Sequence, residues 1–126
     1  MREQYVEAVL ETVALIPAGR VLAYGDIAEL LGTGGPRQVG AVMSHFGSSV
    51  PWWRVIRASG EPPQCDDGSA LGLYEAEATP LRRNLSGRAR YKVDMRTGRW
   101  QPSDTEFEAV EAIVRKMSEP YGEVVP

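Results

Sequence analysis

The stretch YGDIAELLGTGGPRQVGAVMSHF, residues 24–46, decides the fold because it predicts two short helices joined by a glycine-containing turn. Gly32 is suited to end the first helix, and Pro36 to open the second, where the missing N–H of proline costs nothing. The apolar residues recur at helical spacing: Ile27, Leu30 and Leu31, then Val39, Val42 and Met43. This arrangement is typical of a DNA-binding helix–turn–helix.

The outer face of the second predicted helix carries small and polar side chains. In a helix–turn–helix the second helix enters a groove of the duplex, and small side chains let its backbone approach the DNA. We therefore predict DNA contacts from Arg37, Gln38, Gly40, Ala41, Ser44 and His45. Tyr24, at the start of the first helix, is expected either to pack in the core or to donate its hydroxyl to a phosphate. The alternative is an ordinary helical hairpin in a core, with Arg37 as a solvated surface residue.

Two longer helices are expected near the ends of the chain. Residues 2–16 carry an apolar stripe of Tyr5, Val6, Val9, Leu10 and Val13. Residues 103–120 begin with a capping box of Ser103 and Glu106, which is followed by a stripe of Phe107, Val110, Ile113 and Val114.

The middle of the chain predicts short elements. Residues 54–58 read as a strand, and residues 61–78 read as a long polar loop without a clear period. Residues 79–85 predict a brief helix, because Thr79 and Pro80 suit its first turn. Residues 89–102 alternate in polarity around a turn at RTG, which predicts a small hairpin.

Composition restricts the class of protein. The 126 residues suffice for one domain, and 43% hydrophobic with 25% charged residues is globular composition. No apolar run reaches membrane-spanning length, and the N-terminus lacks the features of a signal peptide. One cysteine and one histidine exclude an internal disulfide and the usual zinc sites. We expect a cytoplasmic protein with no metal, no cofactor and no membrane partner.

Charge is distributed unevenly along the chain. The net charge of −3 hides a basic segment over residues 82–99, which holds seven basic residues and one acid. The segment from Ser103 onward holds six acids and two bases.

The stretch VPWWRVIRASG, residues 50–60, places two of the three tryptophans side by side. Indole rings are unfavourable to expose, so such a pair fills a core or a pocket. With GRVLAYGDIAELLG and RQVGAVMS, this stretch resembles the DNA-binding domain of the alkylguanine-DNA alkyltransferases. That family shows G-x-V-x-[ST]-Y-G-x-[IL]-A, R-x-V-G-x-[AG]-[ML] and P-C-H-R-V in the same order.

The resemblance implies a mainly α fold with a small β element, a winged-helix-like helix–turn–helix domain as in the C-terminal domain of the alkyltransferases. It covers residues 1–60 well, and the stretch that ends in W-x-P is similar to the end of alkyltransferase-like proteins. We predict a DNA-binding domain over residues 1–102 and a helical extension, residues 103–126, packed on the same domain.

In the family, the cysteine of P-C-H-R-V accepts an alkyl group from a flipped O6-alkylguanine, and a histidine and a distant glutamate activate it. Trp52 and Trp53 stand at the first two positions here. RRNLSG is the nearest match that we assign to the glutamate pattern L-L-x-x-E-G, and it has Ser86 at the acid position. An indole cannot act as the activated nucleophile. The chain thus resembles the alkyltransferase-like proteins, which bind the lesion without repairing it, and we predict that it is not an enzyme.

The resemblance also implies roles for single residues. Arg37 matches the arginine that fills the gap in the base stack, and Tyr24 matches the tyrosine that helps to rotate the flanking phosphate. The residues predicted for the lesion pocket are Trp52, Trp53, Arg54, Val55 and Ser59. A core position remains open for both tryptophans, and above all for Trp53, since neighbours in extended structure face opposite ways.

The function that we predict is a non-enzymatic, monomeric sensor that binds and flips O6-alkylguanine in duplex DNA. It would associate with the nucleoid when bound and hand the site to nucleotide excision repair proteins. One alternative is a DNA-binding or protein-interaction module without lesion specificity. Another is an alkyltransferase that uses Cys65, which Asp66 and Asp67 disfavour because they raise a thiol pKa.

Overall fold

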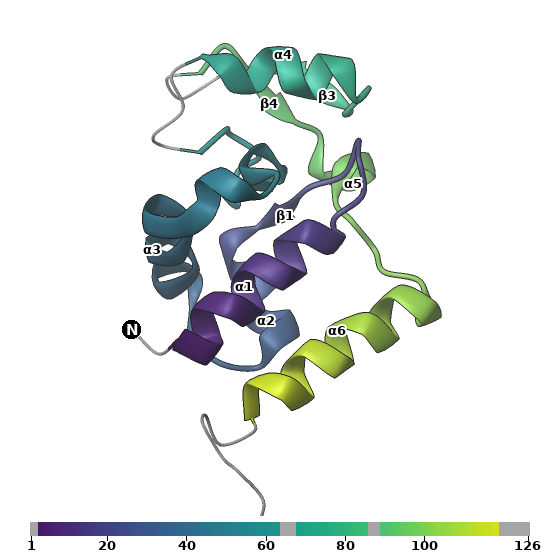
Figure 1. The fold of residues 1–126 in the computed structure, drawn as a ribbon. Coiled ribbons are helices and arrows are strands. Elements are labelled where there is room, and N and C mark those ends of the chain that lie inside the picture. Colours follow the sequence, from purple (N-terminus) through teal and green to yellow (C-terminus); the bar gives the residue numbers. More distant parts are fainter. Residues whose placement is uncertain (1–2, 64–67, 86–88, 119–126) are drawn as a thin grey trace, which may run out of the picture.

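The helix–turn–helix predicted from residues 24–46 is present in the computed structural model, which describes residues 3–63, 68–85 and 89–118. Helix α2 (Tyr24–Leu31) ends at Gly32, whose φ of 72° is the left-handed conformation that favours glycine. Helix α3 (Pro36–Phe46) begins with its proline and buries Val39 and Val42 completely. The two helices, joined by this turn (Figure 1), contact each other.

The main core lies between the helix–turn–helix and the two long helices α1 (Glu3–Leu15) and α6 (Asp104–Ser118). Helix α6 runs along α1 in Figure 1 and contributes three buried residues to this core: Val110, Ile113 and Met117. The predicted capping box is confirmed, because the Ser103 amide donates to Glu106 Oε1 (2.8 Å) and the Glu106 amide donates to Ser103 Oγ (3.2 Å).

The predicted apolar stripe of α6 is wrong at Phe107, which is 45% exposed. The face that packs on α1 runs through residues 110, 113 and 117. Phe107 lies about 60° away from Val110 around the helix, at the edge of this face. It therefore remains on the surface although its spacing fits an apolar stripe.

A two-stranded parallel sheet connects the helix–turn–helix to the tryptophan segment. Strand β1 (Leu22–Ala23) pairs with β2 (Val55–Ile56), with Leu22 opposite Val55. The chain reaches β2 through two short 3₁₀ turns, η1 (Gly47–Ser49) and η2 (Trp52–Arg54). The predicted strand at residues 54–58 is thus confirmed in its centre, and the tryptophans lie on the turn that enters it.

The predictions for residues 61–102 are largely wrong. Part of the predicted loop is helix α4 (Ser69–Ala76), which buries Ala70 and Tyr74. The predicted helix at 79–85 is strand β3 (Leu81–Arg83), which pairs antiparallel with β4 (Tyr91–Val93). Because β4 pairs with the preceding strand, the RTG segment is free to form the short helix α5 (Met95–Gly98) instead of a hairpin turn. Pairing between strands overrides the local helix signals of Thr79 and Pro80.

Helix α4 and the β3–β4 hairpin lie together at one end of the molecule (Figure 1). A second cluster of buried side chains holds them to β1 and β2: Val21, Ile56, Ala70, Tyr74 and Val93. No helix in the described part of the chain is long and apolar enough to cross a membrane.

Ala78, which follows α4, has a φ of 56° and is the one non-glycine residue with positive φ in the described segments. The left-handed conformation costs an L-residue about 1–2 kcal/mol, whereas glycine adopts it freely and loses about 0.5–1 kcal/mol through chain entropy. We expect Ala78→Gly to raise the free energy of unfolding by about 0.5–1 kcal/mol, measured by urea denaturation. Ala76→Gly, within α4, is the matched control and should lower it; equal losses in both variants would contradict the argument.

Candidate nucleic-acid interface

The outer face of α3 is open in the structure, as its sequence predicted. Arg37, Gln38, Ser44 and His45 are exposed, and Gly40 and Ala41 are half-buried. The Arg37 side chain has neither an ion pair nor a hydrogen bond to any described residue. Its guanidinium is therefore available to a ligand.

Gly40 leaves an open space at the middle of this face. A Cβ atom added at Gly40 would meet no other atom within 4 Å. Glycine is unfavourable inside a helix by roughly 1 kcal/mol relative to alanine. No described atom outside α3 fills the space beside this glycine, so the helix backbone is accessible from outside at this point.

Tyr24 begins α2 and is half-buried against the main core. The N-terminus of α2 is fixed by Asp26, whose Oδ2 accepts from the Ala23 amide (2.9 Å) and lies 3.2 Å from Arg99 Nε. The Tyr24 side chain is thus carried on an anchored helix terminus, and the neighbouring Gly25 lies close to Pro36, the first residue of α3.

The two tryptophans are both partly core and partly surface. Their rings meet edge to face, with centroids 5.7 Å apart and an angle of 89°. Both are half-buried and pack against the second cluster, and Tyr74 donates its hydroxyl to the Trp53 carbonyl (2.5 Å). Each indole is therefore held by the core and still presents area to the outside.

Arg54 is fully engaged by the scaffold. Its guanidinium donates twice to Glu77, from Nε to Oε1 (3.0 Å) and from Nη2 to Oε2 (2.5 Å), and from Nη1 to the Ile16 carbonyl (2.8 Å). The side chains of Arg54 and Glu77 are each 14% exposed. Arg54 was predicted as part of the lesion pocket, where it would order the turn through backbone carbonyls; its contacts tie η2 to the end of α4 and, through the Ile16 carbonyl, to the end of α1.

Glu77 is the charged partner in this arrangement and was missed from the sequence. Burial alone would raise its pKa, but hydrogen bonds from Arg54 and from the Gly19 amide (3.2 Å) outweigh burial and lower it. The Trp53 indole N–H faces the same carboxylate and adds to this lowering, although it does not reach hydrogen-bond geometry. Glu77 is therefore held ionised beside Trp53.

The position of Glu77 changes the assignment of the family's glutamate. The segment LYEAEA, residues 73–78, fits L-L-x-x-E-G with Tyr74 for leucine and Ala78 for glycine, and Ala78 has the positive φ that suits glycine. Glu77 also lies beside Trp53, which stands at the histidine position. It is a better match than Ser86, which lies outside the described residues. By this match an acid, Glu77, stands at the glutamate position, while the positions for nucleophile and base hold indoles.

The remaining predicted pocket residues differ in access. Val55 is fully buried in the main core, so it supports the segment from inside and does not reach a ligand. Ser59 is exposed, and its hydroxyl donates to Glu61 Oε1 (3.1 Å). Cys65 lies outside the described residues. Within those residues, no three His, Cys, Asp or Glu side chains come close enough to hold a metal ion.

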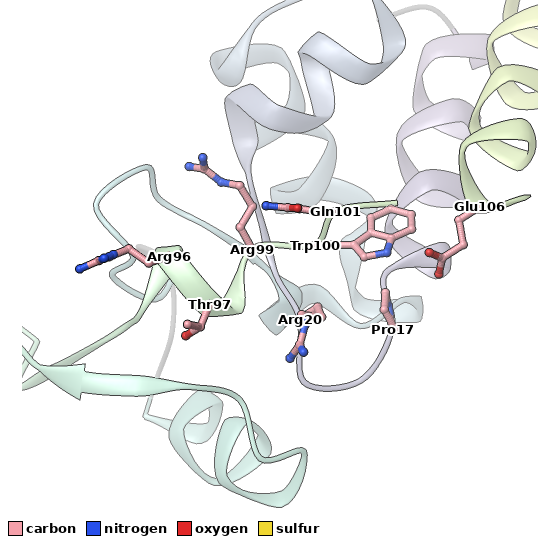
Figure 2. A pocket seen from close by; sticks show the side chains of 8 residues that line it. All are labelled: Pro17, Arg20, Arg96, Thr97, Arg99, Trp100, Gln101 and Glu106. Atoms are coloured by element: carbon pink, nitrogen blue, oxygen red, sulfur yellow. The ribbon is translucent and has the colours of Figure 1, made fainter. Parts of the chain in front are cut away.

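A separate pocket of about 350 Å³ lies between the α1–β1 loop, α5 and the start of α6. Figure 2 shows the side chains that line it: Pro17, Arg20, Arg96, Thr97, Arg99, Trp100, Gln101 and Glu106. None of these residues was predicted as part of the DNA-binding face or the lesion pocket. The Trp100 indole is 4% exposed and faces the Glu106 carboxylate.

Comparisons with known proteins agree with this architecture. Residues 4–78 match the family model for the 6-O-methylguanine DNA methyltransferase, DNA binding domain. The chain is 41% identical over 61 residues to the DNA base-flipping protein of Escherichia coli (strain K12), covering 46% of this chain and 47% of that protein. It therefore spans about half the length of that relative. It is 30% identical over 107 residues to alkyltransferase-like protein 1 of Schizosaccharomyces pombe (strain 972), covering 79% of this chain and 97% of the relative.

Solved structures give the same result. The chain is similar to S. pombe Atl1 in complex with damaged DNA containing O6-carboxymethylguanine, with a TM-score of 0.68 and 31% identity over 81% of this chain and 100% of that one. A second complex of the same protein with DNA has a TM-score of 0.69. The predicted mainly helical fold with a small sheet is confirmed. The chain belongs to the family of the 6-O-methylguanine DNA methyltransferase DNA-binding domain, among its alkyltransferase-like members.

Proposed function

We propose that this protein is a non-enzymatic sensor that binds O6-alkylguanine in duplex DNA and flips it out of the stack. The observation that carries the proposal is the half-buried Trp52 on η2, at the position where the family has its alkyl-accepting cysteine. The relatives named as base-flipping and alkyltransferase-like proteins, and the Atl1 complex with damaged DNA, support lesion recognition on this scaffold.

The outer face of α3 provides the contacts to the duplex in this proposal. Gly40 and Ala41 allow the helix backbone to approach, while Arg37 enters the space that the flipped base leaves. Tyr24, at the anchored N-terminus of α2, contacts the rotated phosphate. Flipping costs a few kcal/mol, and less for a damaged base, so these contacts need only be modest to offset it.

The tryptophan segment provides the pocket wall. Stacking of a base on an aromatic ring contributes ~1–3 kcal/mol, and an indole also offers apolar contact to an alkyl group. Trp52 is held edge to face by Trp53, which is itself fixed through its carbonyl by Tyr74. A ring held in this way is oriented before the base arrives, so little side-chain entropy is lost on binding.

Alkyl transfer has no acceptor in this proposal. Trp52 lacks a lone pair for the reaction, and the Glu77 carboxylate has Arg54 as a two-fold partner. A bound lesion therefore stays chemically unchanged. We propose that nucleotide excision repair proteins receive it, and that the sensor acts as a cytoplasmic monomer that associates with the nucleoid on binding.

The test is a fluorescence-anisotropy titration of two labelled duplexes that differ only in one O6-methylguanine or guanine. We expect tighter binding of the lesion duplex and, by mass spectrometry of the intact protein afterwards, no added methyl group. Equal affinity for both duplexes would favour a DNA-binding module without lesion specificity. An added methyl group, on Cys65 or elsewhere, would show that the protein is an alkyltransferase rather than a non-enzymatic sensor.

Substitution of Gly40 tests the approach of α3 to DNA. We expect Gly40→Leu to lower the affinity for both duplexes at least about tenfold, because a bulky side chain there holds the helix away from the groove. The free protein should be as stable as wild type or more so, since the added Cβ meets nothing and leucine favours helix. Ala112→Leu, on the exposed face of α6, is the matched control. Unchanged DNA affinity in Gly40→Leu would exclude this face from the interface.

A further inference from the structure

The β3–β4 hairpin presents basic side chains on its outer face. The register places Arg82 directly opposite Lys92, and Leu81 opposite Val93. Leu81, Tyr91 and Val93 belong to the second cluster, so the alternation along each strand turns Arg82 and Lys92 away from it. Arg83 and Arg90 are exposed on the same hairpin, with Arg83 on the side of its strand away from Arg82.

These four cations have no counter-charge in the described structure. None of Arg82, Arg83, Arg90 and Lys92 forms an ion pair with a described residue, although the chain holds 17 acids against 14 bases. Like charges directly opposite each other on a sheet destabilise it. The free protein therefore carries an unfavourable arrangement that a polyanion would neutralise.

The hairpin is attached to the segment that carries Trp52. The Tyr91 ring meets the Tyr74 ring, with centroids 6.2 Å apart, and Tyr74 holds the Trp53 carbonyl. Leu81 and Tyr91 pack against the same cluster as both tryptophans. The position of these cations relative to the tryptophan segment is thus set by core packing.

We propose that the outer face of the β3–β4 hairpin binds the phosphate backbone of the DNA beside the lesion, chiefly through Arg82 and Lys92. This inference rests on the proposed function, because a base held at Trp52 brings the flanking backbone towards an element packed on the same cluster. Phosphate contacts fix position without reading sequence. The hairpin therefore strengthens binding to damaged and undamaged duplex alike, whereas Arg37 and Trp52 set the preference between them.

The experiment compares Arg82→Gln/Lys92→Gln with wild type over a salt series, using the O6-methylguanine and guanine duplexes. Each lost phosphate contact reduces the slope of log K against log salt by ~0.9, so the slope should become shallower by roughly 2. At low salt, affinity for both duplexes should fall on the order of tenfold, with their ratio unchanged. The variant should unfold at the same temperature as wild type or slightly higher, because the opposed charges are gone.

The control is Arg115→Gln/Lys116→Gln, which makes the same change in net charge on the last turn of α6; it also removes the Lys116–Glu11 ion pair, so its unfolding temperature is measured beside its slope. An equal change of slope in this control would show that the effect comes from net charge alone and would overturn the proposal. An unchanged slope in the hairpin variant would overturn it as well. Arg82→Gln alone, which keeps Lys92, gives a second test with an expected slope change of about 1 if the double variant folds poorly. If the hairpin variant loses affinity while wild type shows no lesion preference, the hairpin contact stands and the sensor function fails. If wild type prefers the lesion duplex but the hairpin variant has an unchanged salt slope, the sensor function stands and the hairpin contact fails.

Discussion

Arg37→Ala is expected to lower the affinity for a duplex with one O6-methylguanine by on the order of 30-fold, close to 2 kcal/mol. In the proposed function, the flipped base leaves a gap in the stack, and the Arg37 guanidinium fills it and offsets part of the few kcal/mol that flipping costs. Arg37 is exposed and has no partner among the described residues, so its removal should leave the stability of the free protein unchanged.

The result is diagnostic only when both duplexes are measured. Affinity for the guanine duplex should fall much less, because no base is flipped there and Arg37 then makes at most a phosphate contact. Losing one such contact changes the slope of log K against log salt by about one unit. Arg115→Ala, an exposed arginine on α6, controls for net charge. Equal losses for both duplexes would show that Arg37 contacts only the backbone and that another residue fills the gap.

Glu77→Ala is expected to lower the free energy of unfolding by about 3 kcal/mol, the scale for removing one partner of a largely buried ion pair. The change leaves the Arg54 guanidinium, 14% exposed, without its two-fold partner, and removes the acceptor for the Gly19 amide. Urea denaturation measures this loss. The control is Arg54→Met/Glu77→Met, which removes both charges and should be much less harmful than Glu77→Ala alone.

The same pair predicts the response of stability to pH. The pKa of Glu77 in the folded protein lies below its ordinary value of 4.5, so its contribution is complete above pH 4.5 and is lost as the pH falls through the lowered pKa. Wild type should therefore lose stability on acidification below that point more steeply than Glu77→Gln. If the free energy of unfolding of the two proteins followed parallel pH profiles, the Arg54–Glu77 pair would not contribute to stability. A small loss of unfolding free energy in Glu77→Ala would lead to the same conclusion.

The parts of the fold that were predictable from sequence are those encoded locally. The spacing of Ile27 and Leu31, the glycine after them and the proline at the start of α3 specify the helix–turn–helix without reference to the rest of the chain. The capping box of Ser103 and Glu106 similarly fixes the start of α6. Each signal lies within a few residues of the structure that it produces.

The parts that were not predictable depend on distant partners. Strand β3 exists because it pairs with β4, and its own three residues, with Thr79 and Pro80 before them, favour a helix start. Helix α4 buries only Ala70 and Tyr74, and Gly72 between them weakens its signal. Since this segment was taken for a loop, Glu77 was not recognised as the partner of Arg54, 23 positions earlier in the chain. The spacing L-x-x-x-E in LYEAEA, which fits the family's glutamate pattern, was the one sequence feature that pointed to Glu77.

The candidate site shows the same division. The exposure of α3's outer face followed from its helical period, and the motif placed Trp52 and Trp53 on the turn into β2. The complete burial of Val55 and the commitment of Arg54 to Glu77 and Ile16 depend on tertiary packing around η2. Motif position alone therefore grouped residues that support the tryptophan segment from inside with residues that are exposed enough to touch a ligand.

The central claim is that Trp52 lies against the flipped base, and tryptophan emission tests it most directly. Trp53→Phe/Trp100→Phe leaves Trp52 as the one tryptophan, and the variant is titrated with the O6-methylguanine duplex and then with the guanine duplex. We predict that the lesion duplex changes Trp52 emission strongly at saturation while the guanine duplex, bound to the same extent, changes it little. Unchanged emission with a saturating lesion duplex, or the same change with both duplexes, would contradict the proposed lesion pocket.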